Sequence, residues 1–76
     1  MNANQRKEIA KLRGQLEEIK ARIEELGEEE TEKFENLSEG LQQAEKGQEM
    51  DAAADALSSA ADTLSEVVDA LTELEG

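Results

Sequence analysis

The first half of the chain carries large apolar residues at alternating intervals of three and four positions. They are Ile9, Leu12, Leu16, Ile19, Ile23 and Leu26. This heptad pattern is typical of a helix that packs on another helix through one stripe of side chains. It predicts a helix over residues 3–35, with Asn2 or Asn4 as its N-cap.

Two features disturb this pattern. Gly14 and Gly27 lie inside the predicted helix, where each glycine costs about 1 kcal/mol relative to alanine. After Leu26 the next large apolar residue is Phe34, eight positions further on. Such a change of spacing locally unwinds a coiled coil. We therefore expect the packing stripe to shift near the end of this helix.

The second half contains a seven-residue repeat, visible in the units ADALSSA, ADTLSEV and VDALTEL. It predicts a second helix over residues 48–75. One seam series is Met50, Leu57, Leu64 and Leu71, and the other is Ala53, Ala60, Val67 and Leu74. A third series, Ala54, Ala61 and Val68, widens the apolar face. A face of that width indicates contact with more than one neighbouring helix.

Residues 36–47 separate the two helices and are predicted to form a loop. The residues that favour a turn or a helix cap are Asn36, Ser38, Gly40 and Gly47. Leu37 and Leu41 lie within this loop, and we expect both to point back onto the helices and close the end of the bundle.

The charge distribution predicts how the two helices lie. The net charge is −12, and residues 50–76 hold seven acidic and no basic side chains. Acidic residues at the C-terminal end of a helix oppose its macrodipole, as do basic residues at an N-terminal end. An antiparallel arrangement compensates both, because Arg6, Lys7, Lys11 and Arg13 then face Glu66, Asp69, Glu73 and Glu75. Within the first helix, pairs four apart are expected to add support: Arg13–Glu17, Glu18–Arg22 and Lys20–Glu24.

The predicted fold is all-α: a single domain, residues 1–76, that forms an antiparallel two-helix hairpin and assembles into a homo-oligomeric helical bundle. Chains this short are marginal as monomers, and no cysteine is present to form a disulfide. We expect a homo-oligomer, most simply an antiparallel dimer. The expected core and oligomer residues are Ile9, Leu12, Leu16, Ile19, Ile23, Leu26, Met50, Leu57, Leu64, Val67, Leu71 and Leu74.

Composition argues against most chemistry. Without His or Cys, the commonest parts of zinc sites and of nucleophilic catalysis are missing. We expect no enzyme activity, no cofactor and no metal. The run EEETE at residues 28–32 is interpreted as a solvated helix face, with a metal-binding carboxylate patch as the alternative. The negative charge argues against direct nucleic-acid binding. The absence of a long apolar run and the polar N-terminus predict a cytoplasmic protein without membrane association.

The loop resembles that of a group of short bacteriophage and prophage helical-hairpin proteins with a turn of the form F-(D/E)-N-L-P-E-G-L-Q-x-S-E-(K/R)-G. The matching residues are Phe34, Glu35, Asn36, Leu37, Glu39, Gly40, Leu41, Gln42, Glu45, Lys46 and Gly47. Ser38 stands where proline is usual, and Ala44 stands where serine is usual. The resemblance implies a phage origin and an accessory or counter-defence role in an infected bacterial host.

Two kinds of stoichiometric binding are consistent with these features. The first hypothesis is sequestration of a small anionic nucleotide, such as a cyclic or ADP-ribose-derived immune signal, at the loops of an oligomer. Its candidate ligand-binding residues are Lys33, Phe34, Asn36, Ser38, Gln42, Gln43 and Lys46. The alternative is an acidic coiled-coil inhibitor or adaptor that docks on a basic host protein, DNA mimicry included. Its acidic face would run from Asp51 to Glu75.

Overall fold

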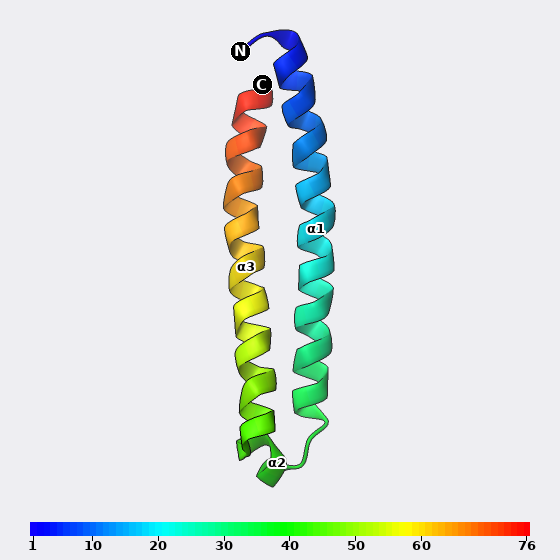
Figure 1. Cartoon of the computed structure of the whole chain (residues 1–76), viewed down its shortest axis with the longest axis vertical. Coiled ribbons are helices and arrows are strands. Elements are labelled where there is room, and N and C mark those ends of the chain that lie inside the picture. The colour runs from blue at the N-terminus through cyan, green and yellow to red at the C-terminus, as the bar shows by residue number, and fades with distance from the viewer.

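The computed structural model describes residues 1–76 and consists of helices, with no strand. Helix α1 spans Ala3–Glu35, α2 spans Glu39–Gln43 and α3 spans Glu45–Glu75. The two long helices lie side by side and antiparallel, so that both termini are at one end and α2 is at the other (Figure 1). The resulting hairpin is elongated, with Cα extents of 58 × 14 × 13 Å. No helix is long and apolar enough to cross a membrane.

Helix α1 starts with a capping box at Asn2. The Asn2 side chain accepts a hydrogen bond from the backbone N–H of Gln5 at 2.8 Å. The Gln5 side chain accepts one in return from the backbone N–H of Asn2 at 3.1 Å. These two bonds satisfy donors that the first turn of a helix leaves without partners. The bounds of α1 are those expected from the pattern, and neither Gly14 nor Gly27 interrupts it.

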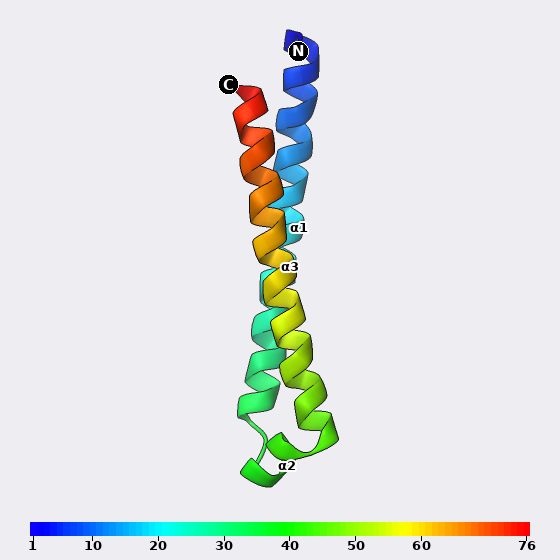
Figure 2. The ribbon, with the colours of Figure 1, turned by 90° about the vertical axis from the view of Figure 1, so that its left-hand side faces the viewer.

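The connection is shorter and more ordered than the loop predicted over residues 36–47. Helix α3 begins at Glu45, three residues earlier than expected, and the short α2 lies between the two long helices. The Ser38 side chain caps α2 by accepting a hydrogen bond from the N–H of Leu41. Figure 2 shows α2 crossing the end of the hairpin between α1 and α3.

Gly47 fixes how closely α2 approaches α3. Gly47 is buried, and a Cβ placed on it would lie 2.6 Å from the carbonyl oxygen and 2.7 Å from the Cα of Gln42. A real side chain there would overlap the α2 backbone, so the turn requires glycine at this position. The expectation that Leu41 closes the end of the bundle is wrong, because Leu41 is 56% exposed. Leu37 is half-buried.

The seam between α1 and α3 uses one of the two predicted heptad series on each helix and replaces the other. On α1, the side chains turned towards α3 are Ile9, Leu16 and Ile23 together with Arg13, Lys20, Gly27 and Phe34. On α3, they are Met50, Leu57, Leu64 and Leu71 together with Ala54, Ala61, Val68 and Glu75. Ala61 is 5% exposed and Ile9 is 9% exposed, and they are the buried apolar residues of the chain.

Four residues expected in the core are exposed in the single chain: Leu12, Ile19, Val67 and Leu74. Each lies three positions from a seam residue, on the side of its helix away from the seam centre. The intramolecular seam therefore excludes them, and their burial in an oligomer stays a prediction. Leu26 is half-buried beside the seam.

Ion pairs within α1 follow the expected pattern in part. Two predicted pairs form, Arg13–Glu17 at 3.0 Å and Lys20–Glu24 at 3.6 Å. The predicted pair between Glu18 and Arg22 is wrong. Arg22 instead reaches Glu25 at 3.1 Å and Glu29 at 3.7 Å, towards the C-terminus of α1.

Candidate functional site

Most of the candidate ligand-binding residues at the turn form hydrogen bonds that stabilise the turn. The amide nitrogen of Gln42 donates to the backbone carbonyl of Phe34 at 3.1 Å. Ser38 caps α2 with its hydroxyl oxygen. The backbone N–H of Asn36 caps the C-terminus of α1 by donating to the carbonyl of Glu32 at 3.0 Å. These contacts favour the interpretation of the turn as a capped connection between helices.

The two lysines of the turn differ in their surroundings. Lys33, in the last turn of α1, donates to Glu30 at 3.1 Å. Lys46, in the first turn of α3, is exposed and forms no ion pair. Gln43 is exposed, and its carbonyl accepts a hydrogen bond from the side chain of Gln48 at 3.2 Å. The structure therefore brings Phe34 and Gln42 into contact, whereas Lys33 is paired within α1 and Lys46 has no ion-pair partner.

The start of α3 is the one helix N-terminus in this hairpin without a side-chain cap. Its N-cap residue, Ala44, has no side chain that can accept a hydrogen bond. A helix N-terminus carries a partial positive charge that favours anions. Glu45 in the first turn already places a carboxylate there, so the position is partly neutralised within the chain.

A row of acidic side chains, here called the acidic ladder, runs along the outside of α3. It consists of Asp51, Asp55, Asp62, Glu66, Asp69 and Glu73, all exposed. None of them takes part in an ion pair, whereas five glutamates of α1 do. The acidic ladder is therefore uncompensated charge displayed to solvent.

One ion pair joins the two long helices. The side chain of Arg13 donates two hydrogen bonds to the carboxylate of Glu75, from Nε at 2.5 Å and from Nη2 at 3.0 Å. The hydrogen bonds that Arg13 donates to Glu75 raise the pKa of Arg13 above its ordinary value, and the bond it donates to Glu17 adds to the effect. The guanidinium therefore stays charged under all ordinary conditions.

The other ion pairs expected between basic residues of α1 and acidic residues of α3 do not form, so that prediction is wrong apart from Arg13 and Glu75. No ion pair joins Arg6, Lys7 or Lys11 to α3. The reason is geometric: Glu75 falls in the same heptad series as Ala61 and Val68, which faces α1, whereas Glu66, Asp69 and Glu73 belong to series that face outwards.

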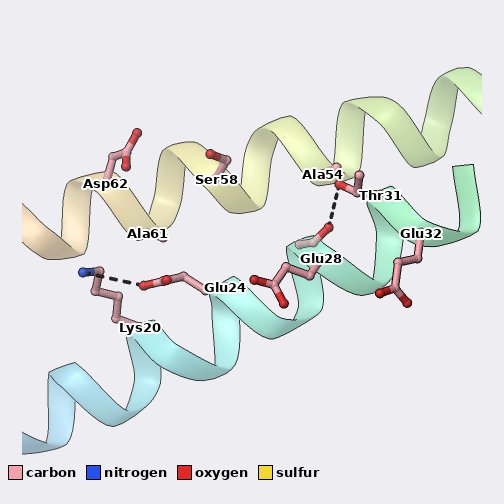
Figure 3. Close-up of a pocket in the computed structure, with 10 residues that line it drawn as sticks. Lys20, Glu24, Glu28, Thr31, Glu32, Ala54, Ser58, Ala61 and Asp62 are labelled. Atoms are coloured by element: carbon pink, nitrogen blue, oxygen red, sulfur yellow. Dashed lines mark hydrogen bonds and ion pairs between the residues drawn. The ribbon is translucent and has the colours of Figure 1, made fainter. Parts of the chain in front are cut away.

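A shallow groove of about 530 Å³ runs between α1 and α3 near the middle of the hairpin. Its floor is made of small residues, Gly27, Ala54 and Ala61, which leave space that larger side chains would fill. Figure 3 shows its rim, where Lys20 is paired with Glu24 and the other charged groups are carboxylates. The rim carboxylates are Glu24, Glu28, Glu32 and Asp62.

The glutamates of residues 28–32 do not converge. Glu29 contacts Arg22 and Glu30 contacts Lys33, on different sides of α1. The hydroxyl of Thr31 donates to the carbonyl of Gly27 at 3.0 Å (Figure 3). No group of three or more acidic side chains in the chain is placed to hold a metal ion.

Sequence reasoning missed two features of the surface. It did not predict that Glu75 would be the one acidic residue of α3 to pair with Arg13. Glu75 lies seven residues after Val68, and this spacing could have indicated that it faces α1. Sequence reasoning also missed the groove, which the coincidence of Gly27 on one helix with Ala54 and Ala61 on the other could have indicated. Comparisons of this chain with protein-family models, with curated proteins and with solved structures give no match.

Proposed function

We propose that this chain is a non-enzymatic binding module that acts stoichiometrically, by docking its acidic ladder on a basic protein surface. The observation that supports this best is the absence of ion-pair partners for all six ladder residues. Exposed charges of one sign along a rigid helix attract a surface of opposite sign over distances near the Debye length of about 8 Å. Such complementarity governs partner choice and association rate.

Rigidity adds to this proposal. The ladder lies on a helix of 31 residues that is held along its length by α1. Its spacing is therefore set before binding, and little conformational entropy is lost when a partner docks. The resemblance of the turn to phage and prophage hairpins directs the search to basic proteins in the cytoplasm of a bacterial host. We also propose that the module works as a homo-oligomer.

The test compares two variants with the same change in charge. One neutralises part of the ladder, with Asp51→Asn, Asp55→Asn, Asp62→Asn and Asp69→Asn. The matched control neutralises four exposed, unpaired acids of α1, with Glu8→Gln, Glu18→Gln, Glu28→Gln and Glu32→Gln. Each is used as bait in a bacterial lysate, and the affinity of each purified candidate is measured at two salt concentrations.

The proposal requires a basic protein whose affinity falls at least tenfold with salt and with the ladder variant, and less with the control. Equal loss with both variants would indicate an effect of net charge alone. A wild-type bait that retains no basic protein at low salt would also contradict the proposal.

Sequestration of an anionic nucleotide at the turn is a second candidate, supported by the uncapped start of α3 and the unpaired Lys46. The test is calorimetry with a panel of cyclic and ADP-ribose-derived nucleotides. Binding should be lost in Lys46→Glu and retained in Lys7→Glu, which makes the same charge change at the far end. Absence of heat with every nucleotide would remove this candidate.

A further inference from the structure

The hairpin exposes more surface than a folded protein of its size should. A compact monomer of 8.3 kDa exposes about 4,600 Å², whereas this chain exposes 5574 Å². The excess is about 1,000 Å². Only 3 of the 76 residues are buried, so the two helices provide a seam but not an enclosed core.

Part of this additional exposed surface is a continuous row of apolar side chains, here called the apolar stripe. Its members are Leu12, Ile19, Leu26, Ala53, Ala60, Val67 and Leu74. Four of its large side chains are exposed: Ile19 at 51%, Leu74 at 48%, Leu12 at 46% and Val67 at 41%. Single exposed apolar residues are normal on a protein surface, but a contiguous row marks an interaction surface.

The two halves of the stripe lie on the same side of the hairpin. On each helix the stripe residues fall about 80° from the seam centre, in the same rotational sense when each helix is viewed from its own N-terminus. Because the helices are antiparallel, equal offsets place both rows on one face. The Arg13–Glu75 pair sets the register, as does the position of Gly27 opposite Leu57, whose Cβ would lie 3.5 Å from a Cβ added to Gly27. In that register Leu12 is level with Leu74, and Ile19 is level with Val67.

The α3 side of this face carries no charge along most of its length. The residues that flank the stripe there are Ala56, Thr63 and Ala70, all exposed. The acidic ladder and the groove lie on other sides of the hairpin, since both belong to different heptad series. The α1 side is flanked by Glu8, Gln15, Arg22 and Glu29. The uncharged α3 side, in a chain of net charge −12, favours association rather than solubility.

We propose that the apolar stripe is covered by a second copy of this chain, which completes a four-helix bundle. A face of 58 by 14 Å offers about 800 Å², the area that each partner contributes to a standard protein interface. This proposal rests on the proposed homo-oligomer and deepens it by naming the face that associates. It does not depend on the docking of the acidic ladder, because the two use different faces.

Size and charge both favour an end-over-end arrangement, in which the two turns lie at opposite ends of the dimer. The stripe has large side chains at Leu12 and Leu74 and a small one at Ala53. When the partner copy runs in the opposite direction, large residues pack against small ones and the helices stay evenly spaced. Residues 1–20 and 60–76 hold five basic and eight acidic side chains, and residues 21–59 hold three basic and twelve acidic. Reversal separates the two strongly negative halves.

The arrangement places α3 against α3 of the partner copy, along the alanine-rich part of each stripe. The midpoint of the stripe on α3 is beside Thr63, and the α1 residue level with that point is Arg22. Arg22 already contacts Glu25 and Glu29 on its own helix, so its charge is balanced where the two α1 helices cross.

The first test is sedimentation of the full chain together with its thermal unfolding at several concentrations. A dimer with a Tm that rises with protein concentration is expected, because dissociation is coupled to unfolding. Ile19→Glu should give a monomer or unfold the chain at a concentration where the matched control, Ala21→Glu, remains a folded dimer. A monomer with a concentration-independent Tm, a trimer or larger assembly, or a fully dimeric Ile19→Glu would overturn the proposal.

The second test reports orientation. The chain has no cysteine, and Gly40 is exposed with open space around it, so Gly40→Cys accepts a single spin label at the turn. The end-over-end dimer predicts a label-to-label distance close to the 58 Å length of the hairpin. A distance within about 20 Å, which is the span of two packed helices, would overturn this arrangement.

Discussion

Arg13 and Glu75 are 62 positions apart in the sequence and form the one ion pair that joins α1 to α3. The contact is bidentate, which gives it geometric specificity that a single lysine contact would lack. Glu75 is the last residue of α3, so the pair lies at the open end of the hairpin, where Figure 1 shows both termini. It therefore holds the last turn of α3 against α1 where no turn connects them.

Removal of this ion pair should loosen the open end of the hairpin. Arg13→Gln or Glu75→Gln is expected to lower the Tm, but by less than Ile9→Ala, which removes buried apolar contacts near the same end. Amide hydrogen exchange should increase in residues 70–75 before it increases in the middle of α3. A double-mutant cycle of Arg13 and Glu75 measures their coupling, and strictly additive effects would contradict the pairing.

Two alanines of α3 should respond differently to enlargement. Ala61 is 5% exposed in the seam, so Ala61→Leu should overpack it and destabilise the hairpin by about 1–3 kcal/mol. Ala52 is exposed and belongs to neither the seam nor the apolar stripe, so Ala52→Leu should leave the free energy of unfolding nearly unchanged. Chemical denaturation followed by circular dichroism measures both, and equal effects would show that the seam is assigned to the wrong series.

Glycine should be required at Gly47 and dispensable at Gly14. Gly47→Ala places a Cβ against the backbone of α2, and we expect a loss of about 1–3 kcal/mol. A Cβ added to Gly14 would meet no other atom within 4 Å, so Gly14→Ala should stabilise α1 by up to about 1 kcal/mol. Thermal unfolding of the two variants gives the comparison, and a stabilised Gly47→Ala would contradict the close approach of α2.

Added salt should stabilise the protein. The acidic ladder has no ion-pair partners, and like charges four apart on a helix are destabilising. Screening at 1 M salt, where the Debye length is about 3 Å, should therefore raise the Tm above its value at 0.1 M. The ladder variant with four Asp→Asn substitutions should lose most of this dependence. A Tm that falls with salt would mean that attractive ion pairs dominate.

The sequence was sufficient to predict the helices and their antiparallel direction, but not which faces meet. The bounds of α1 follow from its apolar spacing and from the cap at Asn2. On α3, however, Ala53, Ala54 and their successors form two series that both satisfy a heptad seam. Periodicity alone cannot choose between them, because the choice depends on how the chain enters the helix. That entry is determined by α2 and Gly47, whose contact is a tertiary feature.

The turn presents the same difficulty. Asn36, Ser38 and Gln42 are residue types that can bind an anion, and they are also the types that cap helices. In the structure they serve as caps and turn contacts. Sequence reasoning therefore located the polar groups correctly but could not tell which of them the fold would use.

The close contact of Gly47 with α2 has a consequence for the whole length of α3. A helix behaves as a stiff rod over a distance such as this, so the rotation imposed on its first turn is transmitted through all 31 residues to Glu75. A single glycine at the closed end thereby determines which row of side chains stands outermost at the open end. The face that α3 presents to its surroundings can therefore be changed from a buried position at the other end of the hairpin.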